Sequence, residues 1–171
     1  LFAKGKWIIT RWIANMTFRQ LGPDAIVQVN EGTLPMTDPT IVAAAQTMQD
    51  MNAKGYFGPG VNSVDEDIAY QMMLNGEAAM CYTGSWFTEQ LEGEDNNVGE
   101  DMGLMSFPTF EGGKGSGNDW LSHYGLTLAF SADGWDDAMK DWAAYVFPKY
   151  GDYALENLGL LTAYTMREEH E

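Results

Sequence analysis

Apolar residues recur at helical spacing in the first third of this sequence. Residues 6–21 are rich in Trp, Ile, Met and Phe, and this predicts a helix that ends near Gly22-Pro23. A second helix is predicted to begin at Asp38-Pro39, where Asp supplies a cap and Pro suits the first turn, and to stop at Gly55. Its inward face is predicted to consist of Ile41, Ala44, Ala45, Met48 and Met51.

Two more amphipathic segments follow, and each predicts a helix. Ser63-Val64-Asp65-Glu66 has the pattern of a capping box, and the helix after it is expected to stop at Asn75-Gly76. Residues 135–146 form the other segment, which Pro148 is expected to end. The predicted inward residues are Ile68, Ala69, Met72 and Met73 in the first and Ala138, Met139, Trp142 and Val146 in the second. Short helices are predicted over residues 87–91 and 153–158.

Short apolar runs bounded by turn residues predict strands between the helices. Buried strands are expected over residues 78–83, 102–107 and 124–130, and a short strand over 25–29. The acidic run 92–101 is expected to be a solvated loop, and the glycine-rich run 111–118 a flexible loop. Several helices mixed with separated strands favour an α/β fold.

The charge balance excludes some classes of partner. The 171 residues carry a formal net charge of −16, which disfavours binding to nucleic acid or to an anionic membrane surface. No apolar stretch approaches the length of a membrane span, and no signal peptide is visible. The single cysteine, Cys81, cannot form an internal disulfide, and we expect it to be a small buried residue in a strand.

The sequence contains no recognisable catalytic or metal-binding motif. It has two histidines, His123 and His170, which are too few for most histidine metal sites, and we expect neither a metal nor a cofactor. No nucleophile elbow, dinucleotide fingerprint or metalloprotease motif occurs, so we expect no catalytic residue. Carboxylates are plentiful, however, and a glycoside hydrolase fragment with paired carboxylates remains an alternative.

Tryptophans near predicted junctions are the most informative feature. Trp86 directly follows Gly84-Ser85 at the end of a predicted strand, and α/β folds form ligand crevices at such ends. An indole face can cover the apolar face of a pyranose while nearby polar groups bind its hydroxyls. Trp12 and the group Trp120, His123 and Tyr124 also lie near predicted junctions. Each tryptophan alone is more often a core residue than a platform for a ligand.

Several motifs, in order, resemble those of family 1 extracellular solute-binding proteins, the class that includes maltose-binding protein. Gly76-Glu77-Ala78-Ala79-Met80-Cys81-Tyr82-Thr83-Gly84-Ser85-Trp86 is similar to the family pattern G-x-A-A-M-x-x-x-G-x-W. The helix from Asp38-Pro39 to Lys54-Gly55-Tyr56-Phe57 and the segment Met102–Thr109 with Gly112-Gly113 also resemble family segments. So do Tyr124–Ser131 and Asp137–Tyr145, and the resemblance covers about Trp12 to Gly159.

This resemblance implies a type II periplasmic-binding-protein-like fold with two α/β lobes. Residues 1–110 would form most of the second lobe, and residues 111–171 a crossover strand and helices that return to the first. The chain starts without Met, and the resemblance implies that parts of both lobes lie beyond its two ends. The family's sugar-stacking aromatic maps onto Trp86, beside Ser85. The remaining ligand-binding residues implied are Trp12, Trp120, His123, Tyr124 and Gly125.

The resemblance also implies a function and partners. The chain would bind a mono- or oligosaccharide outside the cytoplasm, in the periplasm or as a cell-surface lipoprotein, and pass it to the membrane permease of an ABC transporter. We expect a monomer that is not an enzyme and that binds sugar weakly or not at all on its own. A peptide, polyamine or metal ligand, or a pure interaction module with an exposed apolar patch, are alternatives.

Overall fold

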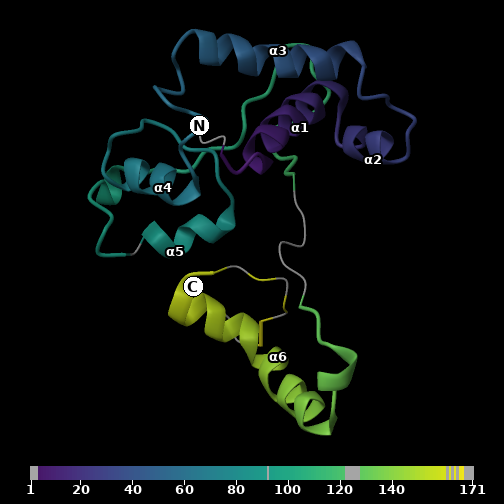
Figure 1. Cartoon of the computed structure of the whole chain (residues 1–171), viewed down its shortest axis with the longest axis vertical. Coiled ribbons are helices and arrows are strands. Elements are labelled where there is room, and N and C mark those ends of the chain that lie inside the picture. The colour runs from purple at the N-terminus through teal and green to yellow at the C-terminus, as the bar shows by residue number, and fades with distance from the viewer. Residues whose placement is uncertain are drawn as a thin grey trace. The chain divides into compact units, whose positions relative to one another are not determined.

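The computed structural model describes residues 4–91, 93–121, 128–160, 162, 164, 166 and 167. Contacts divide the chain into two units, Leu1–Tyr82 with Glu100–Leu121 and Thr83–Gly99 with Ser122–Glu171. The first contains the α-helices α1 (Trp7–Leu21), α2 (Ala25–Asn30), α3 (Pro39–Ala53) and α4 (Glu66–Leu74) (Figure 1). The second contains α5 (Thr88–Leu91), α6 (Asp137–Leu158) and the 3₁₀ turns η1 (Ser85–Phe87) and η3 (Ala132–Gly134); a further turn, η2, spans Gly99–Asp101.

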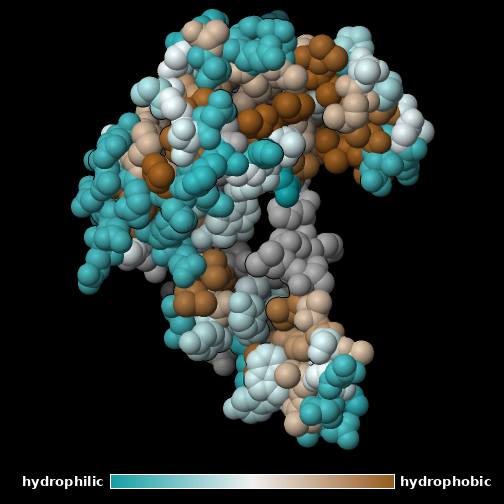
Figure 2. Space-filling view, viewed as in Figure 1, coloured by the Kyte–Doolittle hydropathy of each residue, from teal (hydrophilic) through white to brown (hydrophobic). Residues whose placement is uncertain are grey.

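The core of the first unit lies between α1 and α3. These helices run side by side, and Met16 of α1 packs with Ala44 and Met48 of α3 (Figure 1). Figure 2 shows apolar side chains gathered along α1 in this unit. The residues packed around this core are Trp12, Ile13, Phe57, Phe107 and Phe110. The predicted helix over 6–21 and the inward positions Ile41, Ala44 and Met48 are thus confirmed.

Aspartates cap three of the helices. Asp38 begins α3, and its carboxylate accepts a hydrogen bond from the Thr40 N–H at 2.8 Å. At α4 the cap is Asp65, which accepts from the Ile68 N–H at 3.2 Å, so the predicted capping box starting at Ser63 is wrong. A carboxylate is a stronger acceptor than a hydroxyl, and Asp65 also binds the Lys4 ammonium at 2.9 Å. Asp136 caps α6 in the same manner through the Met139 N–H.

Replacement of the α3 cap should lower stability measurably. We expect Asp38→Ala to reduce the free energy of unfolding by about 1 kcal/mol, because the Thr40 N–H loses its acceptor. Asp24→Ala is the matched control, since Asp24 precedes α2 but makes no capping hydrogen bond. Urea unfolding followed by circular dichroism measures both variants. Equal losses in the two would contradict the capping role of Asp38.

The predicted strand over residues 25–29 is wrong, since this segment forms α2. Its backbone groups bond locally, with Gln28 N–H donating to Asp24 O and Glu31 N–H to Val27 O. Gly22, at φ 103°, reverses the chain after α1 and brings Ala25 into a buried position. Weak apolar alternation over five residues does not distinguish a strand from a single amphipathic helical turn.

The other strand predictions also differ from the structure. Residues 78–83, 102–107 and 128–130 are irregular, and no β-strand occurs among the described residues. Residues 79–82 and 102–107 exchange no backbone–backbone hydrogen bond with any described residue. A strand needs a partner for its N–H and C=O groups, and apolar character in one segment does not supply that partner. Residues 124–127 of the third predicted strand lie outside the described residues.

Helix α6 continues through the residue that was expected to end it. Pro148 lies inside α6, and the predicted short helix over 153–158 is the last part of the same helix. An interior proline costs a helix about 3 kcal/mol. Buried residues lie on both sides of it, Ala143 before and Ala154 after, and left-handed Gly159 closes the helix. Trp142, expected to be buried, is 49% exposed. No helix in the described part of the chain is long and apolar enough to cross a bilayer.

Candidate functional site

In the second unit, one turn places two neighbouring aromatic residues in different environments. Gly84, Ser85, Trp86 and Phe87 form the 3₁₀ turn η1 and the residue before it, and the Phe87 N–H donates to Gly84 O at 3.0 Å. Phe87 is buried, with 4% of its surface exposed, whereas Trp86 is 37% exposed. The turn therefore assigns the core role to Phe87 and leaves part of the Trp86 indole available to solvent.

Gly84 leaves space for the Trp86 ring. A side-chain carbon at position 84 would overlap the six-membered ring of Trp86. The backbone of Gly84 is extended, with φ −123°, so glycine is required here for space and not for backbone conformation. The spacing Gly84-Ser85-Trp86 thus holds the indole directly against the main chain.

The end of α6 fixes the other side of this turn. The Thr88 hydroxyl lies 2.7 Å from Ser85 O and 2.8 Å from Gly159 O, and these two carbonyls share its single proton. Gly159 is the left-handed cap of α6, with φ 60°. Ser85 itself is exposed beside Trp86. Two residues of the predicted site, Ser85 and Trp86, therefore lie together on a turn held at both of its ends.

The Gly84 packing leads to a direct prediction. We expect Gly84→Ala to displace the Trp86 indole, because the added methyl group occupies the space of the ring. Gly103→Ala is the matched control, since a side-chain carbon there meets no atom within 4 Å. The indole N–H resonance of Trp86 in a ¹H–¹⁵N spectrum should move in the first variant and stay in the second. An unmoved resonance in Gly84→Ala would contradict this packing.

Trp12 lies in an aromatic cluster of the first unit. Its ring packs edge-on against Phe107 at a centroid distance of 5.4 Å and against Phe57 at 6.3 Å, and it is tilted against Tyr82 at 5.8 Å. The indole Nε1 is buried and has no hydrogen-bond partner among the described residues. These contacts account for Trp12 as a packing residue within its own unit.

Tyr82 and Cys81 continue from this cluster. The buried Asn15 amide donates to the Tyr82 hydroxyl at 2.7 Å, and burial raises the pKa of that hydroxyl. Cys81 is half-buried in an irregular segment, not in the predicted strand, and its thiol contacts Tyr82 O at 3.7 Å. Burial also raises the pKa of the Cys81 thiol. Neither group is prepared to act as a nucleophile or a base.

The raised thiol pKa predicts slow chemistry at Cys81. The thiolate is the reactive form, and the folded chain keeps this thiol protonated to a higher pH than the unfolded chain does. We expect a disulfide reagent at about pH 8 to modify the native protein more slowly than the urea-unfolded protein. Equal rates in the two states would show that burial does not protect the thiol.

Trp120 is presented by a loop that Arg19 binds. Trp120 is 66% exposed, and the preceding carbonyl, Asp119 O, accepts from the Arg19 guanidinium at 2.7 Å. The sequence interpretation missed Arg19. The signal that could have revealed it is a basic residue in the last turn of the helix. The glycine-rich run 111–118, predicted to be a flexible loop, is bound to α1 by the Arg19 bond to Ser116 O and by the Gly115 N–H.

The remaining predicted site residues, His123, Tyr124 and Gly125, lie outside the described residues. Of the others, Trp86 and Ser85 share one turn of the second unit. Trp12 and Trp120 belong to the first unit, where Phe107 connects them: its ring packs on Trp12 and its carbonyl accepts from Arg19. No group of three or more potential metal ligands occurs in the part of the chain that the structure describes.

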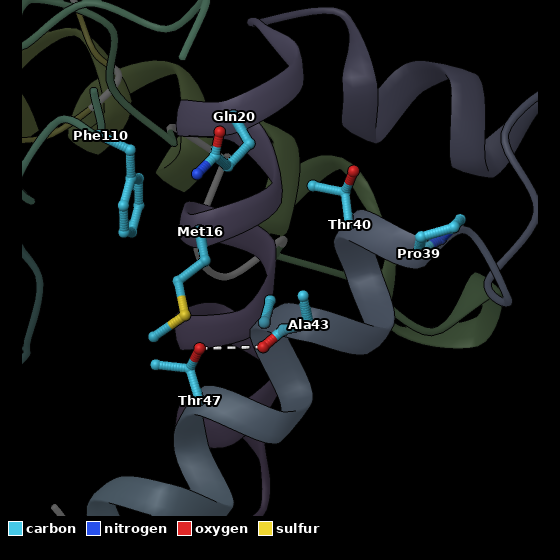
Figure 3. Close-up of a pocket in the computed structure, with 8 residues that line it drawn as sticks. Met16, Gln20, Pro39, Thr40, Ala43, Thr47 and Phe110 are labelled. Atoms are coloured by element: carbon cyan, nitrogen blue, oxygen red, sulfur yellow. Dashed lines mark hydrogen bonds between the residues drawn. The ribbon is translucent and has the colours of Figure 1, made fainter. Parts of the chain in front are cut away.

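A groove of about 340 Å³ opens between α1 and α3 (Figure 3). Met16 and Gln20 line it from α1, Phe110 lines it from the other side, and the Thr47 hydroxyl is occupied by a bond to Ala43 O. The other lining residues are Pro39, Thr40, Ala43 and Ala44. Small side chains on α3 leave this space, and the sequence analysis did not anticipate it.

Comparison with known proteins gives two matches. The model of the family of bacterial extracellular solute-binding proteins matches residues 1–148. A solved structure is similar to the whole chain with a TM-score of 0.80 and 21% identity. It comes from a biochemical and structural study of xylan utilization by the thermophilic bacterium Caldanaerobius polysaccharolyticus. The match covers 100% of this chain but 44% of that one. No curated protein shows a significant match.

Proposed function

This chain belongs to the family of bacterial extracellular solute-binding proteins, and we propose that it binds a carbohydrate for an ABC transporter. The match to the solved structure supports a periplasmic-binding-protein-like fold. The family supports a location outside the cytoplasm. We propose that the protein lies in the periplasm or on the cell surface as a lipoprotein. We also propose that it is a monomer and that its partner is a membrane permease. The division into lobes near residue 110 is part of the same proposal.

The partly exposed Trp86 indole is the observation that carries the carbohydrate proposal. An indole that is backed by Gly84 and held by a turn loses little conformational entropy when a ligand stacks on it. Exposed Ser85 lies beside it and can bond to a ligand hydroxyl. A neutral sugar also suits a chain of net charge −16, since its binding brings no further negative charge.

The similar solved structure suggests which sugars to test first. Because that structure concerns xylan utilization, we propose xylo-oligosaccharides as the first ligand class. This chain corresponds to 44% of that protein, so we expect it to make part of the contacts and to bind in the millimolar range. No observation among the described residues favours the glycoside hydrolase alternative.

Saturation-transfer difference NMR suits such weak binding. The test offers the chain xylo-oligosaccharides, maltose and cellobiose, with spermidine and a neutral tripeptide as ligands of other classes. We expect signals from one or more of the neutral sugars, with saturation strongest at ring C–H protons. Signals from spermidine or the tripeptide with none from any sugar would contradict the proposal.

A further inference from the structure

Arg19 is a buried cation bound to backbone carbonyls. Its residue surface is 1% exposed, yet no described carboxylate lies at ion-pair distance from it. Instead, its Nε–H donates to Phe107 O at 3.1 Å, and its NH1 group donates to Ser116 O and to Asp119 O. A buried charge is costly unless polar groups surround it, and here three carbonyl dipoles do so.

These three carbonyls lie at separate points of one segment, residues 107–120, which we call the connection. Phe107 lies at its start, Ser116 in its middle, and Asp119 immediately before Trp120. A planar guanidinium presents its donors in a fixed fork, so one side chain sets the relative positions of all three carbonyls. An apolar residue at position 19 could fill the same volume, but it could not set these positions.

The main chain of the connection also docks on the end of α1. The Gly115 N–H donates to Arg19 O at 2.9 Å, and the Lys114 N–H donates to Gln20 O at 3.2 Å, which satisfies carbonyls left free where the helix ends. A side-chain carbon at Gly115 would lie 2.7 Å from Phe18 O, and one at Gly113 would lie 2.5 Å from Arg19 O. Both glycines therefore permit this close approach.

Two hydrogen bonds between Ser116 and Asp119 form a turn in the connection just before Trp120. The Ser116 N–H donates to the Asp119 carboxylate at 2.6 Å, and the Asp119 N–H donates to Ser116 O at 3.2 Å. The next residue, Trp120, is largely exposed. Because this turn is anchored, it fixes the main-chain position from which the Trp120 side chain extends. The indole ring itself has few neighbours.

We propose that Arg19 is a positioning residue that sets the main-chain position from which Trp120 meets the solute. The ligand in this inference rests on the proposed function, whereas the Arg19 contacts do not depend on that function. It predicts that disturbing the Arg19 contacts changes sugar binding through Trp120, and not through a general loss of structure.

Two variants and a matched control test this inference. Arg19→Lys keeps the charge but loses the planar fork, and Gly115→Ala keeps the arginine but pushes the connection away from the main chain of Phe18 and Arg19. Gly117→Ala lies in the same connection, where a side-chain carbon meets no atom within 4 Å. The first measurement needs no sugar: the heteronuclear NOE of the Trp120 indole should fall in the two variants and stay unchanged in the control.

The second measurement is a double-mutant cycle with Trp120→Ala, read out as sugar affinity. We expect Gly115→Ala to weaken binding about threefold or more in the parent chain and to have no further effect once Trp120 is absent. If the Trp120 NOE is unchanged in both variants, or if the losses of affinity simply add, the inference is wrong. If no sugar binds, the proposed function fails, and the NOE alone still decides the role of Arg19.

Discussion

Trp86→Ala should weaken sugar binding about thirtyfold, which moves a millimolar interaction out of the measurable range. Removing an aromatic anchor from a binding site costs about 2 kcal/mol, and Trp86 is the aromatic residue that its turn leaves partly exposed. Saturation-transfer signals from a bound xylo-oligosaccharide should disappear in this variant. The physical reason is the lost stacking surface, since Phe87 remains to hold the turn in the core.

Trp142→Ala is the matched control for this experiment. Trp142 lies on α6 in the same unit and is 49% exposed, but the proposed site does not use it. We expect the sugar signals of this variant to match those of the parent chain. Full binding by Trp86→Ala, or equal losses in both variants, would remove Trp86 from the site.

Arg19→Met should cause a large loss of stability. The carbonyls of Phe107 and Asp119 lose their Arg19 donor, Ser116 O keeps only the Asp119 N–H, and an acceptor left unsatisfied away from water costs about 1–3 kcal/mol. The cost of burying the cation is relieved at the same time, so we expect a net loss of about 3 kcal/mol. Urea unfolding followed by near-ultraviolet circular dichroism measures the change in the first unit.

Arg11→Met on the same helix provides the comparison. The Arg11 side chain makes no hydrogen bond with a described residue, so we expect a change within about 0.5 kcal/mol. If Arg19→Met is as mild as Arg11→Met, the carbonyl contacts contribute little to stability. The positioning role of Arg19 would then lose its structural basis.

Local features of the helices could be predicted from the sequence. The Asp38-Pro39 start and the Asn75-Gly76 stop depend on neighbouring residues, and the structure confirms both. The family resemblance was also correct, because it depended on the order of many motifs over most of the chain. The error at Ser63 arose because two candidate caps, Ser63 and Asp65, lie within three residues of each other.

Features that depend on distant partners could not be predicted. Strands over 78–83 and 102–107 require a paired segment, and apolar character does not supply one. Helix α6 continues past Pro148, and residues on both sides of the proline, Ala143 and Ala154, are buried in the fold. Arg19 contacts residues 88, 97 and 100 positions further along the chain, so its role becomes visible only in the fold.

The site was predicted in part. The spacing Gly84-Ser85-Trp86 suggested an indole at a turn, and the structure shows that turn with Phe87 in the core and Trp86 outside. It also adds a reason for the glycine, namely the space that the Trp86 ring occupies. The contribution of Trp86, Ser85, Trp12 and Trp120 to ligand binding remains a proposal.

The indole N–H resonances of the six tryptophans offer the most direct test of the central claim. Trp86→Phe and Trp142→Phe assign two of these resonances in a ¹H–¹⁵N spectrum, and a xylo-oligosaccharide is then titrated into the unaltered chain. We expect the Trp86 resonance to shift saturably while that of Trp142 stays in place. A saturable shift of other indoles with Trp86 unmoved, or no shift of any indole, would contradict the assignment of Trp86 as the sugar-binding residue.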